Sequence, residues 1–229
     1  MKKVLFACAI MGCSLRAYAA DQAQNKAVER VKAAAEVVQE IQSAPDQGIP
    51  EEILGSAECV AVVPSMLNGG FVVGGRYGRG IASCRTSKGW SPPAFFSIEG
   101  GSFGLQIGVQ AVDLVMLVMN DNGMRNLLSS KFKLGADASV AGGPVGRHAA
   151  ADTDWKLRTQ VLSYSRARGV FAGVSLDGAV VRQDKDATKE FYGHMVTFES
   201  SLEGSVEPAE GAYPFQATLA KWAQAAATK

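Results

Sequence analysis

The sequence predicts a single-domain α+β protein. Its core is expected to be a curled, glycine-rich antiparallel β-sheet or a barrel-like arrangement, with an N-terminal amphipathic helix, short inserted helices and a C-terminal helix. Three observations lead to this prediction. The 229 residues suffice for one good-sized domain. The 25 glycines suit turns and close backbone approach in sheets better than they suit helices. The apolar residues change from helical spacing to alternation after residue 58, with no linker or fixed-period repeat.

The first 20 residues have the pattern of a signal peptide, so the predicted domain covers residues 21–229. Lys2 and Lys3 precede the apolar stretch Val4–Gly12, and Ala-Tyr-Ala at 17–19 is typical of a cleavage site. A second interpretation stays open, because residues 10–13 are similar to a lipoprotein signal in which Cys13 is acylated. We therefore expect a periplasmic or envelope-associated protein, and an outer-membrane lipoprotein if Cys13 carries the acyl group.

Residues 23–42 are predicted to form an amphipathic helix, because their alanine and valine residues recur at helical spacing. A short helical turn is expected over 49–55. From Cys59 onward the apolar period is two, which predicts short strands bounded by glycine, asparagine and proline. The expected strands are 59–63, 71–77, 80–85, 90–98, 103–110 and 114–119, with a hairpin turn at Gly78-Arg79.

The second half of the chain is predicted to add three helices and further strands. A short helix is expected over 120–130, with Asp121 or Asn122 as its N-cap. Asp184 or Asp186 is expected to begin the next helix. The remaining predicted elements are a strand at 134–140, a hairpin of 161–166 with 170–181, the end of the second helix at Tyr192 and a last helix over 215–226.

Cys59 and Cys84 are the two cysteines that remain after the predicted leader is removed. In an exported protein such a pair predicts a disulfide, which contributes about 3 kcal/mol to stability. The alternative is that both cysteines are small buried apolar side chains. Together with His148 and His194 they show no metal-ligand spacing, so neither a metal nor a cofactor is expected.

One stretch, Gly-Gly-Ser-Phe-Gly at 100–104, matches the G-x-S-x-G pattern of serine hydrolases. That pattern requires a helix after the serine, whereas the residues after Ser102 alternate as in a strand. Asp113 lies between two apolar runs, and a buried carboxylate is expected to accept backbone hydrogen bonds or to meet an arginine. Asp137 and the two histidines have no spacing that supports a catalytic triad. The sequence therefore predicts a protein that is not an enzyme.

The remaining signal is a set of basic residues near predicted turns. Removing Lys2, Lys3 and Arg16 with the leader leaves 20 of the 23 basic residues against 22 acidic ones, so nucleic-acid binding is not expected. A local basic patch can still bind anionic lipid headgroups, at about 1 kcal/mol per contact. The alternative is a solvated face with dispersed charges. The candidates form two groups, Arg76, Arg79, Arg85 and Lys88 on one predicted meander, and Lys131 and Lys133 further along.

Residues 58–200 contain a series of short motifs in a specific order. They are GFVV at 70–73, WSPP at 90–93, GGSFGLQIG at 100–108, DLV at 113–115, LGADASVA at 134–141, GPVGR at 143–147, SYS at 163–165, GVFAGVSLDG at 169–178 and FYG at 191–193. This series resembles the SYLF domain family, known in eukaryotes as a phosphoinositide-binding module and in yeast as an actin-binding one. The resemblance implies a domain that binds membrane lipid and has no hydrolase chemistry at Ser102.

For an exported chain the corresponding ligand is an anionic phospholipid or another lipid of the envelope. We therefore expect a non-enzymatic lipid- or membrane-binding protein of the bacterial cell envelope that recognises anionic headgroups. The alternative is a structural or partner-binding envelope protein, in which exposed sheet edges and Trp90 contact another protein.

Overall fold

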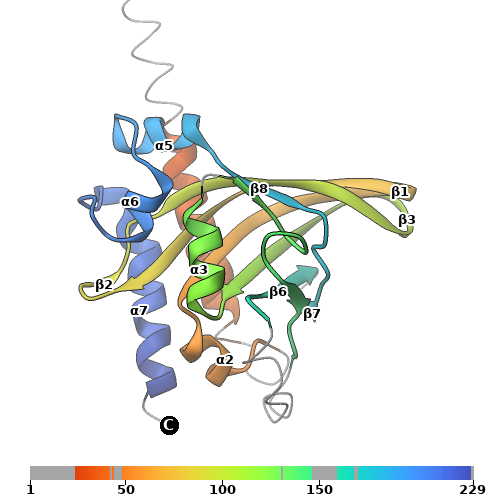
Figure 1. Cartoon of the computed structure of the whole chain (residues 1–229), viewed down its shortest axis with the longest axis horizontal. Coiled ribbons are helices and arrows are strands. Elements are labelled where there is room, and N and C mark those ends of the chain that lie inside the picture. The colour runs from red at the N-terminus through yellow and green to blue at the C-terminus, as the bar shows by residue number, and fades with distance from the viewer. Residues whose placement is uncertain are drawn as a thin grey trace, which may run out of the picture.

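The computed structural model describes residues 24–41, 43, 48–129, 131–145, 159–167 and 170–227. The predicted signal peptide, Cys13 and His148 lie outside these residues. Within them the chain forms an α+β fold, in which a curled mixed sheet makes a half-barrel with helices packed at one end (Figure 1). The predicted fold class is therefore confirmed.

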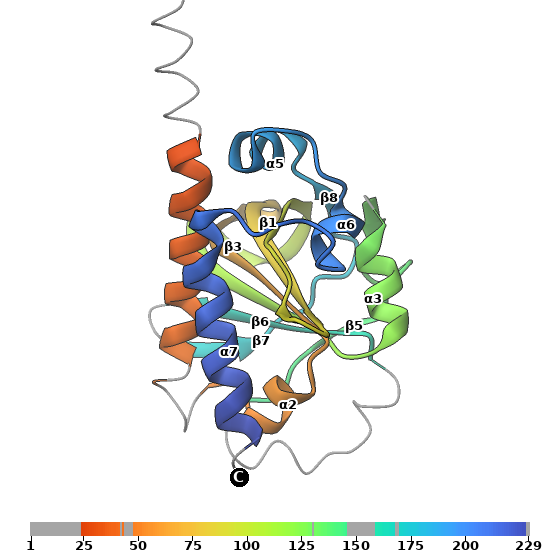
Figure 2. The same ribbon diagram turned by 90° about the vertical axis from the view of Figure 1, so that its left-hand side faces the viewer.

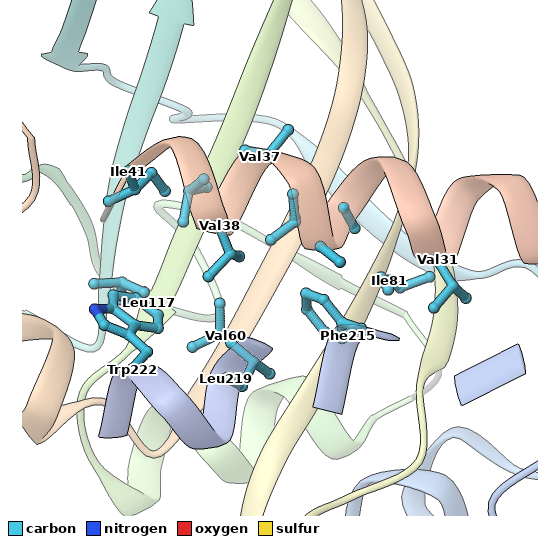
Figure 3. Packing of buried hydrophobic residues seen from close by; sticks show 14 of the residues in the cluster. Val31, Val37, Val38, Ile41, Val60, Ile81, Leu117, Phe215, Leu219 and Trp222 are labelled. Carbon is cyan, nitrogen blue, oxygen red and sulfur yellow. The ribbon is translucent and has the colours of Figure 1, made fainter. Parts of the chain in front are cut away.

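Two long helices pack side by side on one face of the sheet (Figure 2). The N-terminal helix covers residues 24–41, and α7 covers Tyr213–Ala227. The amide of Gln39 donates a hydrogen bond of 3.2 Å to Thr218 Oγ1 and so joins the two helices. The two helices bury apolar side chains that recur at helical spacing, and these contact apolar residues of the strands. The helix residues are Val31, Val38, Ile41, Phe215, Leu219 and Trp222, and the strand residues are Val60, Ile81 and Leu117 (Figure 3).

The sheet is built around two very long strands, β1 (Cys59–Thr86) and β3 (Ala94–Val118). They pair antiparallel along almost their whole length. The short β2 (Gly89–Trp90) connects them and pairs with the end of β1. Glycine at position 89, with φ +111°, allows the tight turn between β1 and β2. The predicted separate strands between 59 and 119 are therefore two continuous ones.

The paired strands form one ribbon that folds back on itself. The Cα atoms of Cys59 and Cys84 are 4.0 Å apart, although both lie in β1. Twenty-five residue steps of straight strand would separate them by about 80 Å. The pairing shifts register after Gly70, where one residue of β1 lies opposite three of β3 before Val72. This shift lies at the far end of the ribbon, on the right of Figure 1.

Two glycines of β1 allow the returning half of the ribbon to approach the outgoing half. A Cβ atom at Gly78 would lie 2.4 Å from Val63 Cγ1, and one at Gly80 would lie 2.4 Å from the carbonyl oxygen of Val62. Such contacts are far inside van der Waals distance, so only glycine fits at either position. The prediction of a hairpin turn at Gly78-Arg79 is wrong, because both residues lie inside the paired part of β1.

The other edge of β3 pairs with β6 (Val161–Ala167) near one end and with β8 (Val180–Gln183) near the other. Three shorter strands complete the sheet. They are β4 (Lys131–Lys133) beside β8, β7 (Val170–Gly173) antiparallel to β6, and β5 (Val140–Gly142) parallel to β6. The parallel pair makes the sheet mixed, which corrects the expectation of a purely antiparallel one.

Alternation along the strands places apolar side chains on both faces of the sheet. Val115 and Leu117 of β3 face the long helices, whereas Leu114 and Met116 face the inside of the curl. The inner layer is closed by α3 (Asp121–Leu128) and α6 (Phe198–Leu202).

The helix starts follow the capping rules, with one difference from the sequence prediction. Asn120, not Asp121 or Asn122, caps α3, and its side chain accepts a 3.0 Å hydrogen bond from the amide of Gly123. Asp184 caps α5 (Lys185–Tyr192) as predicted. The remaining helices are α2 (Glu51–Ser56) and the 3₁₀ turn η2 (Glu210–Ala212). In place of the strand predicted at 134–140, the chain makes a turn at 135–137 before β5.

Candidate functional site

Beyond the end of the long helices, the outer face of the sheet is open and carries charged side chains in two rows across four strands. Each row consists of directly paired residues of β4, β8, β3 and β1, and directly paired residues of antiparallel neighbours point to the same face. The first row is Lys131, Arg182, Ser97 and Arg79, and the second is Lys133, Val180, Glu99 and Tyr77.

Four of these side chains are cations, and we call Arg79, Arg182, Lys131 and Lys133 the basic ladder. All four residues are exposed, with 52% of the Arg79 side chain and 49% of the Arg182 side chain accessible to solvent. Adjacent strands lie about 4.8 Å apart, so the first row extends over about 14 Å. Glu99 is the acidic member of the rows and pairs with Arg182 at 2.6 Å, which leaves the ladder with more positive than negative charge.

Arg79 is held in place by Tyr77 of its own strand and by Asp184, the N-cap of α5. Its Nε donates a 3.1 Å hydrogen bond to the Tyr77 hydroxyl and lies 3.6 Å from Asp184 Oδ2. The hydrogen bond to Tyr77, and then the charge of Asp184, raise the pKa of Arg79. Asp184 also accepts a 3.2 Å contact from Arg30 of the N-terminal helix. One carboxylate therefore fixes the end of the ladder to the helical layer.

Arg76 does not belong to the ladder. It pairs with Gly100, one register beyond the second row, so its side chain points to the opposite face. There its Nη1 donates a 2.9 Å hydrogen bond to the carbonyl oxygen of Ser175, and burial lowers its pKa.

Arg85 and Lys88 are also separate from the ladder. Arg85 donates to the carbonyl oxygens of Ala57 at 2.8 Å and Gly55 at 3.1 Å, and its guanidinium lies 4.7 Å from the ring centroid of Trp90. Lys88 is exposed in the turn after β1. The four residues expected on one meander, Arg76, Arg79, Arg85 and Lys88, therefore do not form one group. The turn predicted at Gly78-Arg79 is a paired part of β1, and Arg76 points to the opposite face from Arg79.

The structure instead unites Arg79 with the second predicted group, Lys131 and Lys133. It adds Arg182 and Tyr77, which the sequence reasoning did not select. Arg182 follows the stretch predicted as one strand of a hairpin, and only the pairing of β8 with both β3 and β4 places it between Lys131 and Arg79. The sequence contains no local signal for that pairing.

A protein-family model matches the half of the chain that contains β4 and β8. Residues 99–222 match the family model Ysc84, described as "Las17-binding protein actin regulator". The match extends over more than half of the chain and includes three of the four ladder residues. This chain belongs to the Ysc84 (SYLF) family. The resemblance seen in the sequence motifs is therefore confirmed.

Curated members of the SYLF family are similar over most of this chain. Protein YSC84 of Saccharomyces cerevisiae is 33% identical over 173 residues, which are 74% of this chain and 37% of the yeast protein. LAS seventeen-binding protein 3 of the same species is 32% identical over 71% of this chain and 36% of its own length. SH3 domain-containing YSC84-like protein 1 of Xenopus laevis is 34% identical over 65% and 45%. The chain thus spans less than half the length of these relatives.

The catalytic motifs weighed in the sequence do not form a site in this SYLF domain. Ser102 lies in the interior of β3, which continues as a strand to Val118, so the strand-turn-helix of a nucleophile elbow is absent there. Asp137 accepts a 2.7 Å hydrogen bond from the amide of Lys133 within a turn. His194 is exposed after the end of α5. In the described part of the chain, no three His, Cys, Asp or Glu residues are grouped as metal ligands.

Asp113 has a structural role at a β-bulge. Pro64 and Ser65 of β1 lie opposite Asp113 of β3, and Ser65 adopts a positive φ of 52°. Asp113 Oδ1 accepts a 2.9 Å hydrogen bond from the amide of Ser65, and its other oxygen accepts from Arg166 Nε, also at 2.9 Å. Arg166 in turn contacts Glu40 of the N-terminal helix. A backbone amide and an arginine are the two partners that the sequence predicts for this carboxylate.

We expect Asp113→Asn to lower the free energy of unfolding by about 2 kcal/mol, because it removes one of the two carboxylates that contact the largely buried Arg166. Urea unfolding followed by circular dichroism measures the loss. Glu207→Gln, at an exposed residue after α6, serves as the matched neutralisation and should change little. An Asp113→Asn protein of wild-type stability would contradict the structural role.

Cys59 and Cys84 are joined by a disulfide in the structure. Both side chains are fully buried in the inner apolar layer, where the two ends of β1 meet. The bridge therefore connects the outgoing and returning halves of the ribbon at its base.

Among the described residues, no helix is both long and apolar enough to span a bilayer.

Proposed function

We propose that this SYLF-family protein is a non-enzymatic binding protein of the cell envelope, attached by its basic ladder to anionic phospholipid headgroups. The observation that carries the proposal is the ladder itself, in which four exposed cations from three strands share one open face. All four residues are exposed on that face, so an anionic membrane surface can reach them.

The expected strength follows from the number of cations. Each lysine or arginine near an anionic membrane surface contributes about 1 kcal/mol, so four contribute at most about 4 kcal/mol, since Arg182 and Arg79 also pair with Glu99 and Asp184. That free energy alone corresponds to a dissociation constant of about 1 mM. Exposed charges are screened over a Debye length of about 8–10 Å at physiological ionic strength, so salt should weaken the attachment.

The test is neutralisation of the two lysines of β4. We expect Lys131→Gln with Lys133→Gln to weaken binding to vesicles of phosphatidylcholine and phosphatidylglycerol by about 30-fold, since two contacts of about 1 kcal/mol are lost. These lysines are preferred to Arg79, because a change there would also leave Asp184 without one of its partners. The protein is expressed with its own leader, purified after export, and sedimented with vesicles.

The matched control is Lys88→Gln with Lys221→Gln, which removes the same charge from two exposed positions outside the ladder. The control should bind as the unmodified protein does. Equal losses in both double variants would mean that net charge, and not the ladder, determines binding. Absence of binding to any vesicle would contradict the lipid proposal.

The envelope location belongs to the same proposal and rests on the leader-like residues 1–20. Fractionation of cells that produce the chain, with Cys13→Ser beside the unmodified protein, distinguishes a periplasmic protein from an acylated one. Loss of membrane association in the Cys13→Ser protein alone would identify the acyl group as the anchor.

A second candidate function is binding of a protein partner. It is favoured by the names of the relatives, one of which is a LAS seventeen-binding protein and whose family is described as actin regulators. Trp90 is a weak candidate for such a contact, because it is half-buried and packs against Arg85. A proteinaceous ligand recovered from envelope extracts, and lost on neutralising Lys131 and Lys133, would assign the ladder to a protein.

A further inference from the structure

The free end of the β1/β3 ribbon differs in composition from the rest of the chain. We define the ribbon tip as residues 67–75 of β1 and 101–111 of β3, on both sides of the fold-back. None of these residues carries a charge, although lysine, arginine, aspartate and glutamate make up 20% of the chain. The ribbon extends beyond every helix, with its tip opposite α7 (Figure 1).

Apolar side chains at this tip are exposed to solvent. Val109 is 77% exposed and Leu67 is 50% exposed. Leu67 pairs with Ala111 and Gly69 pairs with Val109, so the two exposed side chains are diagonal neighbours on one face of the ribbon. This adjacent pair, at the end of an uncharged protrusion, offers a small apolar surface that a bilayer can cover.

The groups behind the tip follow the order of a membrane interface. Along the returning half of the ribbon, the uncharged residues up to Gly75 are followed by Tyr77 in the second row of the basic ladder. The first row, with Arg79 and Arg182, comes next. Proteins that bind bilayer surfaces show the same order. Their apolar residues enter the acyl layer, their aromatic residues lie at its boundary, and their cations contact the phosphates.

We propose that the ribbon tip inserts, tip first, into the outer part of an anionic bilayer while the basic ladder holds the headgroups. The inference rests on the proposed function and supplies the apolar contribution that the ladder alone lacks. Tyr77 lies five residues from Val72, or about 16 Å of strand, so the tip is long enough to pass the headgroups. The occupant is lipid, because the ladder directly behind the tip supplies the cations that anionic headgroups bind.

The test is an environment-sensitive fluorophore on Val109→Cys, in protein purified after export and carrying Cys13→Ser. The bridge between Cys59 and Cys84 leaves the new cysteine as the reactive thiol. With vesicles of phosphatidylcholine and phosphatidylglycerol we expect a blue shift at position 109. The same fluorophore on Lys221→Cys, on the exposed face of α7 at the other end of the molecule, should show none.

A second measurement uses Leu67→Asp with Val109→Asp, which we expect to weaken vesicle binding about tenfold while its salt dependence remains. Met195→Asp is the control, since Met195 is equally exposed but lies far along the chain near α6. Undiminished vesicle binding without a shift at 109 would overturn the insertion and leave the ladder proposal standing. No binding to vesicles would overturn both. A shift without vesicles, with a doubled molar mass, would assign the tip to self-association.

Discussion

Replacing Cys59 and Cys84 together by alanine should lower the free energy of unfolding by about 3.5 kcal/mol, because the bridge closes a long loop in the unfolded chain. The two residues are 25 positions apart in the sequence. They join the halves of β1 where Ala61 and Ala82 also pack in the inner layer, so the bridge holds the ribbon closed at its base. The expected fall in the thermal midpoint is about 10 °C.

Urea unfolding with and without a reductant measures this effect. The reductant should destabilise the unmodified protein to the level of the double alanine variant and should not affect the variant itself. Since both thiols are fully buried in the folded state, reduction should require unfolding or prolonged exposure. A loss below about 1 kcal/mol would contradict the assignment, since removing a native disulfide usually costs about 2 kcal/mol or more.

Gly80→Ala should be similarly damaging, with a loss of about 3 kcal/mol at the upper end of the usual cost of overpacking. A Cβ at this position would lie 2.4 Å from the carbonyl oxygen of Val62, 2.7 Å from Phe96 Cζ and 2.8 Å from Val63 Cγ2. A backbone oxygen cannot rotate away as the end of a side chain can. The two halves of the ribbon would therefore have to separate.

Gly101→Ala is the matched control, because a Cβ there meets no atom within 4 Å. Glycine in a strand interior is weakly destabilising, so this alanine should leave stability unchanged or raise it by about 0.5 kcal/mol. Circular dichroism in increasing urea compares the two variants. If both changes had the same effect, the close approach of the two ribbon halves would be contradicted.

Most of the helices were predictable from the sequence because their signals are local, although α6 was not predicted and the cap of α3 is Asn120. The apolar spacing over 23–42 and the cap at Asp184 depend on residues a few positions apart, and both are confirmed within one or two residues. The ribbon was not predictable in the same way. Gly78 reads as a turn residue, but it is there because Val63 lies against it. Its neighbour in space is 15 positions away in the sequence, and no local pattern contains that contact.

For the candidate site, too, the single residues could be selected from local sequence, whereas their grouping depends on contacts between distant segments. Lys131 and Lys133 could be selected from the sequence as a basic pair, but the strand β4 that carries them was not predicted. Their union with Arg79 depends on the register of three strand pairs, from Lys131 through Arg182 and Ser97. A shift of one residue in any of these pairs would turn the cations to opposite faces. The basic residues could therefore be chosen from sequence, but not grouped.

The folded-back ribbon also bears on how the chain reaches its native state. In the pairing of β1 with β3, the partners Ala82 and Ala94 are 12 residues apart in the sequence. The partners at the other end of this pairing, Cys59 and Val118, are 59 residues apart. Direct closure of the second pair would be slow, because the entropy cost of closing a loop grows with its length. If pairing starts beside β2 and advances residue by residue, each pair shortens the loop that the next must close.

Amide hydrogen exchange during refolding can follow this order, and we expect protection near Ala82 and Ala94 before protection near Cys59 and Val118. Protection that arises first at the distant end would exclude the sequential route. A sheet with high average contact order can then form by steps that are each short in range, and its distant partners meet only because the nearer ones already have.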